Sequence, residues 1–173
     1  MRATLNDLNN LEDPMPAMNF EFLLGNLPAG LNADSLNIKC QQVSLPGMSI
    51  EPMEMALHGQ VLRFPGRKTF PGTLSATFVE ESNVGTQRVF RTWHEKIKST
   101  NTSKSTGYKR DYSVTARINV YDNANVLRDE VDIFGLWLSE LSDIQLDGQS
   151  SQVMLVQVTF TYDTWRSNIH PFE

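Results

Sequence analysis

The chain has 173 residues, 40% of them hydrophobic, and a formal net charge of -5. This length suffices for one domain with a substantial core and is too short for two, so we expect a single domain over residues 1–173. The Lys and Arg residues are scattered along the chain and form no run, which argues against a protein that grips nucleic acid through its phosphates.

The N-terminal residues 1–18 are rich in Asn and Asp and contain Pro14 and Pro16, which predicts an extended arm instead of a helix. The arm is either frayed or pinned by a neighbouring subunit. We expect a short C-terminal tail at 166–173. The N-terminus lacks the apolar stretch of a signal peptide, and no segment approaches the ~20 apolar residues of a membrane helix, so we expect cytosolic synthesis without a membrane anchor. The single cysteine, Cys40, excludes an intramolecular disulfide and is expected to be a buried small residue, not a reactive thiol.

The periodicity of the chain predicts a mainly β fold: a small antiparallel β-sandwich or barrel with one flanking α-helix and extended assembly loops. In chain order we expect strands at 19–24 and 36–43, extended chain at 48–57, a short strand near 61–64, a strand at 73–80, a helix at 84–98, and strands at 110–121, 126–134 and 151–164. Residues 122–125, Asp-Asn-Ala-Asn, tolerate positive φ and predict a hairpin between two of these strands.

The segment 59–72, GQVLRFPGRKTFPG, is a basic loop punctuated by glycine and proline. It is too apolar for a freely solvated loop and too basic for a core, which favours burial against an acidic partner surface. The residues that we expect at this contact are Arg63, Phe64, Arg67, Lys68 and Phe70. A solvated turn is the alternative. The later polar segment 99–109 is expected to be a mobile surface loop, with a contact to a surrounding partner as its alternative.

The predicted helix carries one apolar stripe at helical spacing, which is expected to pack it onto the sheet. The stripe consists of Val89, Phe90, Trp93 and Ile97.

Two predicted strands, 110–121 and 151–164, alternate cleanly between an apolar and a polar face. Such long strands leave unpaired edges that a soluble monomer must protect, and a head-to-tail ring of identical subunits removes them. An ordinary sandwich whose polar face meets bulk solvent is the alternative.

The sequence offers little catalytic chemistry. His58, His94 and His170 lack the companions of a metal site, and there is no nucleophile elbow or phosphate-binding glycine loop. Adjacent carboxylates occur at 80–81 and 129–130, but neighbours on a strand point to opposite faces and do not converge on a substrate. We therefore expect no enzyme and no cofactor.

Several short segments, taken in order, resemble the tail tube proteins of contractile-tailed bacteriophages. They are NFEF at 19–22, QVSLPG at 42–47, FPG at 64–66, VFRTW at 89–93 and RD at 110–111. The resemblance covers about residues 18–165 and depends on the order and spacing of the segments, because each one alone is unspecific. It implies a subunit of which six copies form a ring, with stacked rings forming a conduit for viral DNA inside a contractile sheath. The implied location is the virion tail, after synthesis and assembly in the host cytoplasm.

The resemblance also implies roles for particular residues. The segment 59–72 would lie at contacts between subunits or between rings. The polar strand faces would line the lumen through Ser113, Thr115, Asn119, Gln157, Thr159 and Thr161. The implied partners are other copies of the chain, the sheath, the baseplate and the tail terminator, with DNA passing without sequence-specific binding. The same fold occurs in the secreted tube protein of type VI secretion and in tube-initiating baseplate proteins, so these remain alternatives. A further alternative is a monomeric β-sandwich that binds a partner or acts as a small enzyme.

Overall fold

The computed structural model describes residues 14–100, 107–144, 146 and 152–169. Most of the expected N-terminal arm, the centre of the expected loop at 99–109 and the end of the expected C-terminal tail lie outside these residues. The elements in chain order are β1 (Phe20–Leu24), the 3-10 helix η1 (Pro28–Gly30), α2 (Asp34–Lys39), β2 (Cys40–Val43), β3 (Ser49–Leu57), β4 (Gln60–Thr69), β5 (Thr73–Val79), α3 (Gly85–Ile97), α4 (Lys109–Tyr112), β6 (Val114–Tyr121), β7 (Leu127–Leu141), β8 (Leu155–Thr161) and β9 (Thr164–Ser167).

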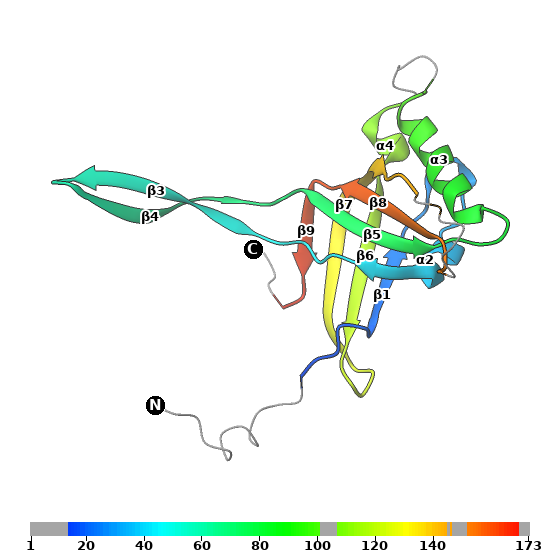
Figure 1. The fold of residues 1–173 in the computed structure, drawn as a ribbon, viewed down its shortest axis with the longest axis horizontal. Coiled ribbons are helices and arrows are strands. Elements are labelled where there is room, and N and C mark those ends of the chain that lie inside the picture. The colour runs from blue at the N-terminus through cyan, green and yellow to red at the C-terminus, as the bar shows by residue number, and fades with distance from the viewer. Residues whose placement is uncertain (1–13, 101–106, 145, 147–151, 170–173) are drawn as a thin grey trace.

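Seven strands form one antiparallel sheet in the order β1-β6-β7-β8-β5-β2, and β9 pairs with β7. The sheet curls into a sandwich-like body (Figure 1). The predicted mainly β fold with a flanking helix is therefore confirmed, whereas the barrel alternative is wrong, because β1 and β2 are the two ends of the strand order and do not pair.

Strand β7 joins the two halves of the sheet. Its first part pairs with β6 and β9, and its last part pairs with β8. Gly135 lies between the two parts with a φ of +68°. A Cβ at this position would collide with the carboxylate of Asp163, so the change of direction requires glycine here.

The core lies between the two halves of the sheet and under α3. Phe22 of β1 lies 6.3 Å from Phe78 of β5 and 6.2 Å from Phe160 of β8, measured between ring centroids. Phe90 of α3 contacts Phe78 with ring centroids 5.0 Å apart. All four rings are almost completely buried. The body thus closes around aromatic side chains from three strands and one helix.

Strands β3 and β4 form a separate two-stranded sheet, hereafter the arm (residues 49–69). The arm projects far from the body (Figure 1). Its turn has positive φ at His58 (50°) and Gly59 (79°), the pattern of a type I′ hairpin turn. The prediction of a loop over 59–72 is therefore wrong, because most of this segment is the second strand of a hairpin, whereas the strand expected near 61–64 exists and is longer than predicted. Pro65 and Gly66 lie at a register shift of the two strands, although in the sequence they resemble loop residues.

Other boundaries also differ from the prediction. The expected strand at 36–43 begins as helix α2, whose N-terminus is supported by a hydrogen bond from the Asp34 amide to Asn32 Oδ1 (2.8 Å) and whose Leu36 is fully buried. The expected strand at 110–121 begins with the short helix α4, the strand at 126–134 continues to residue 141, and the strand at 151–164 is divided into β8 and β9. Strand β9 also occupies the start of the expected C-terminal tail. Among the described residues, no helix is long and apolar enough to cross a membrane.

Candidate assembly surfaces

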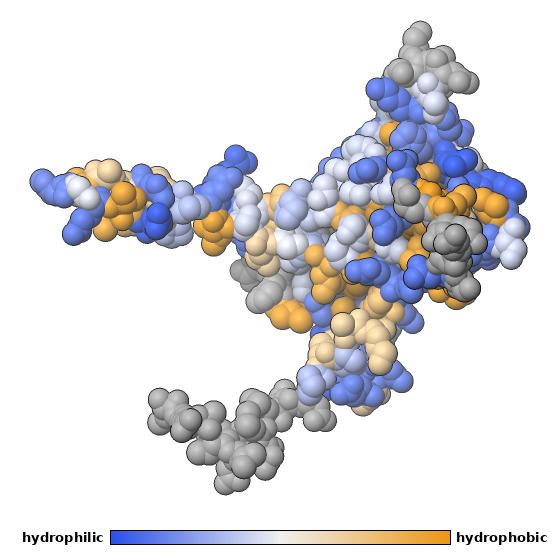
Figure 2. Space-filling model, in the orientation of Figure 1, coloured by the Kyte–Doolittle hydropathy of each residue, from blue (hydrophilic) through white to orange (hydrophobic). Residues whose placement is uncertain are grey.

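The arm exposes an apolar face that no other part of the described chain covers. Met53 pairs with Phe64 and Met55 pairs with Leu62 across the two strands, so all four side chains lie on one face. These residues are between 41% and 59% exposed. Figure 2 shows hydrophobic surface (orange) along the arm. A two-stranded hairpin is marginally stable by itself, so this face is expected to pack on something else.

The opposite face of the arm carries charge. Arg63 Nε lies 2.8 Å from Glu54 Oε1, and both side chains are more than half exposed. An ion pair so open to water contributes little to stability. This face thus carries a charged pair among small apolar residues and prolines, whereas the other face presents large apolar side chains, so the two faces of the arm differ.

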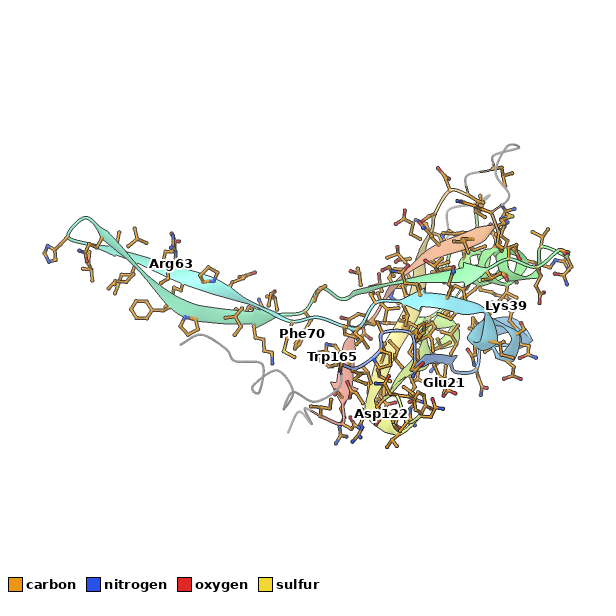
Figure 3. All side chains as sticks on the ribbon, turned by 60° about the horizontal axis from the view of Figure 1, so that its bottom comes forward. Glu21, Lys39, Arg63, Phe70, Asp122 and Trp165 are labelled. Atoms are coloured by element: carbon orange, nitrogen blue, oxygen red, sulfur yellow. The ribbon has the colours of Figure 1, made fainter. Side chains whose placement is uncertain are left out.

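The root of the arm is fixed to the body by aromatic packing. Phe70 lies edge-on to Trp165 of β9, with ring centroids 6.3 Å apart and planes at 89° (Figure 3). Lys68 Nζ lies 5.7 Å from the centre of the Phe70 ring. Trp165 is only 7% exposed, whereas Phe70 is 46% exposed. Of the five expected contact residues, Arg63, Phe64, Arg67 and Lys68 lie in β4 and project with the arm, and Phe70 lies at its root.

A second surface is formed by the outward side chains of β5 and β8. The pairing sets Thr161 opposite Thr73, Thr159 opposite Ser75 and Gln157 opposite Thr77. We call these six residues the uncharged polar face. The structure thus brings three of the expected lumen residues together and adds three from β5. The alternation of the β5 sequence already indicated a polar face, but nothing in the sequence showed that β5 and β8 are neighbours.

The other three expected lumen residues lie elsewhere. Thr115 is exposed on β6, two strands away from β8. Ser113 precedes β6, at the end of α4. Asn119 is only 9% exposed, and its Nδ2 donates to Glu21 Oε2 at 3.3 Å. The outward side of β6 is also charged, because Arg117 forms ion pairs with Asp132 (2.7 Å) and with a further carboxylate of β7. The six expected residues therefore do not form one surface.

The helix α3 packs through the expected apolar stripe. Phe90 and Trp93 are fully buried, and Val89 and Ile97 are partly buried against the core. Trp93 Nε1 donates to the carbonyl oxygen of Tyr112 at 2.9 Å, which satisfies the one polar atom of the indole.

The carboxylates at 80–81 have structural roles. Burial raises the pKa of Glu80, but hydrogen bonds from the amides of Glu81, Gln87 and Thr86 outweigh it and hold this pKa below its usual value. The last two amides belong to the first turn of α3, so Glu80 caps the helix. Glu81 pairs with Lys39 at 2.6 Å. Within the described ranges, no group of three or more His, Cys, Asp or Glu residues could hold a metal ion.

Comparison of the sequence with models of known families gives one match that spans most of the chain. The model of the family described as "Phage tail tube protein" matches residues 15–168. No curated protein sequence matches the chain significantly.

Several solved structures have a similar fold, among them two from an extracellular contractile injection system. A chain of the sheath-tube complex of PVC, an extracellular contractile injection system, has a TM-score of 0.61 and 13% identity, with 96% of this chain and 99% of that chain covered. A chain of the PVC sheath/tube terminator has a TM-score of 0.66 and 14% identity, with 91% and 99% covered. Hcp1 from Flavobacterium johnsoniae has a TM-score of 0.51 and 10% identity, with 90% and 98% covered. At these identities the similarity concerns the fold.

Proposed function

The chain belongs to the phage tail tube protein family, and we propose that six copies of it close into a ring and that the rings stack into a hollow tube through which viral DNA leaves the virion. The tube is enclosed by a contractile sheath and joined to a baseplate and a terminator. The subunit is synthesised and assembled in the host cytoplasm. It acts as a single tail tube domain over residues 1–173. Residues 1–18 form an N-terminal arm, which is distinct from the arm at 49–69, and the C-terminus forms a short tail.

The apolar face of the arm is the observation that carries this proposal. Met53, Met55, Leu62 and Phe64 are side by side and exposed, on an element that leaves the body of its own subunit. The arm points away from the core that it would otherwise join, so we infer that another copy of the chain covers these residues (Figure 1). A contact between an arm and a different patch on the next subunit is heterologous, and such contacts generate rings or filaments.

The uncharged polar face is proposed as the wall of the lumen. Its hydroxyl and amide side chains hold water without attracting a polyanion, whereas a row of Lys or Arg residues would retain the phosphates. Thr73, Ser75 and Thr77 join Gln157, Thr159 and Thr161 in this role. Of the remaining expected residues, Thr115 is retained as a candidate at the margin, while Ser113 and Asn119 are not part of this wall.

A secreted tube subunit or a tube-initiating subunit is the second candidate. The fold shared with Hcp1 supports it, because a tail tube subunit and a secreted tube subunit can use the same fold. The second candidate predicts isolated rings, whereas the tail tube predicts continuous filaments.

The experiment is to purify the chain and to measure its mass and image it by negative-stain electron microscopy over a range of concentrations. We expect hollow filaments of uniform width built from rings of six subunits. Isolated rings favour the second candidate. A particle of one chain, 19.6 kDa at every concentration, would exclude both.

A further inference from the structure

The basic residues are not scattered as the sequence first suggested, because they concentrate in one segment. Residues 84–112 contain seven of the 15 Lys and Arg residues and two of the 20 Asp and Glu residues. The formal charge of this segment is +5, and that of the rest of the chain is -10. A segregation of this size within an acidic protein indicates a surface that meets a negatively charged partner.

The fold collects these cations on one surface, built from α3 and the adjoining α4 and hereafter called the basic surface. Its described cations are Arg88, Arg91, Lys96, Lys98, Lys109 and Arg110, all exposed. Lys109 pairs with Asp163, and Arg110 approaches its neighbour Asp111 at 3.6 Å. Arg91 and Lys98 have no acidic partner among the residues that the structure describes. Figure 2 shows hydrophilic surface (blue) over the region in which Figure 1 places α3 and α4.

The basic surface and the uncharged polar face lie on opposite sides of the same strands. Phe78 of β5 and Phe160 of β8 point toward α3, where they contact Phe90. The neighbouring residues Thr77 and Thr159 point the other way, because successive side chains of a strand alternate. If the uncharged polar face lines the lumen, α3 therefore lies on the outer wall of the tube.

We propose that the basic surface is the contact of the tube with its sheath, and that the sheath presents acidic side chains to it. This inference deepens the proposed function and rests on it. Arg residues form bidentate hydrogen bonds with carboxylates of a protein partner, and Lys residues add a compact positive charge. A protein partner fits better than DNA, because the DNA path lies on the other side of the sheet.

The test uses tails produced with their own sheath and baseplate, carrying the double substitution Arg91→Glu and Lys98→Glu. We expect tubes of normal length with the sheathed fraction reduced by more than about tenfold, because like charges facing each other in a contact cost several kcal/mol and every copy repeats them. The matched controls are Arg91→Lys, which keeps the charge, and Arg166→Glu, which reverses an exposed cation on β9. Both should give sheathed tails at the parental level.

Three results would overturn the inference. The first is a normal sheathed fraction in the double variant. The second is failure of the purified double variant to polymerise while the parent does, since this would make the basic surface a contact between tube subunits. The third is weaker pelleting of a 30-base-pair DNA duplex by variant tubes than by parental tubes (a probe length of about three helical turns), which would assign the surface to nucleic acid. If the parental chain forms no tubes at all, the proposed function fails instead.

Discussion

Phe64→Ser should weaken assembly without weakening the subunit. Phe64 is 41% exposed in the free chain. A phenylalanine side chain can bury roughly 200 Å², so about 80 Å² of the Phe64 side chain is still exposed and can be covered by a neighbouring subunit. At about 25 cal/mol per Å², this area contributes about 2 kcal/mol to each contact. The concentration at which tubes form should therefore rise about 30-fold, because 1.4 kcal/mol corresponds to a factor of ten. The free energy of unfolding of the subunit should change by no more than about 0.5 kcal/mol, as for other exposed sites.

The assay is sedimentation of polymer over a concentration series, with a denaturant melt of the unassembled subunit alongside. Val61→Ser is the matched control, because Val61 lies on the same strand and is 54% exposed, but faces the other side of the arm. It should raise the assembly concentration much less. If Phe64→Ser assembles at the parental concentration, the apolar face is not buried in the tube. If both variants are equally impaired, the cause is lost strand propensity and not a lost contact.

Three further predictions address the core, the lumen and the cysteine. Trp93→Ala should lower the free energy of unfolding by roughly 3–5 kcal/mol in a denaturant melt, because the indole is fully buried; an unchanged midpoint would contradict this packing. Gln157→Lys should leave tube assembly normal but slow DNA ejection at low salt, since each ring repeats the added cation, whereas Gln157→Glu should not slow it; equal ejection rates for both would remove this face from the lumen. Burial raises the pKa of Cys40 to about 12, so its thiol should react with a maleimide far more slowly in the native subunit than in urea at the same pH; equal rates would show that the thiol is accessible.

The parts of the fold that the sequence predicted are those whose stability comes from the chain's own core. The alternation at 73–80 predicted β5, and the stripe built on Phe90 and Trp93 predicted α3, because burial on one side imposes a period that the residues must follow. Strand β7 was predicted only to residue 134. The buried residues of β7 are Val131 and Ile133 before the bend at Gly135, and Leu136 and Leu138 after it. The inward-facing positions therefore shift by one residue at the bend, which breaks the alternation that identifies a strand in the sequence.

The surfaces were harder to predict, because their pattern depends on partners that the chain does not contain. The arm is exposed on both sides in the free subunit, so no core imposes an in-out period on it. Its Pro65 and Gly66 therefore looked like loop residues, although they occupy a register shift within a pair of strands. Alternation predicts the polar face of each strand separately, but it does not show which strands are neighbours. Only the order of the strands shows that β5 and β8, not β6 and β8, share the uncharged polar face.

In the proposed tube, a subunit that polymerises only at the right time has to carry exposed strands without aggregating. The arm meets this requirement with charge and shape. Glu54 and Arg63 face water on the side opposite the apolar face, and the register shift near Pro65 disturbs the regular edge that another strand would need for pairing. Charged residues and irregular edges are the means by which natural sheets resist edge-to-edge association. In the proposed tube, the apolar face is then available to a matching surface on the next copy, while indiscriminate strand pairing is disfavoured. The same features that made this segment resemble a loop in the sequence, Pro65 and the charged residues, thus disfavour pairing of the exposed arm with other strands.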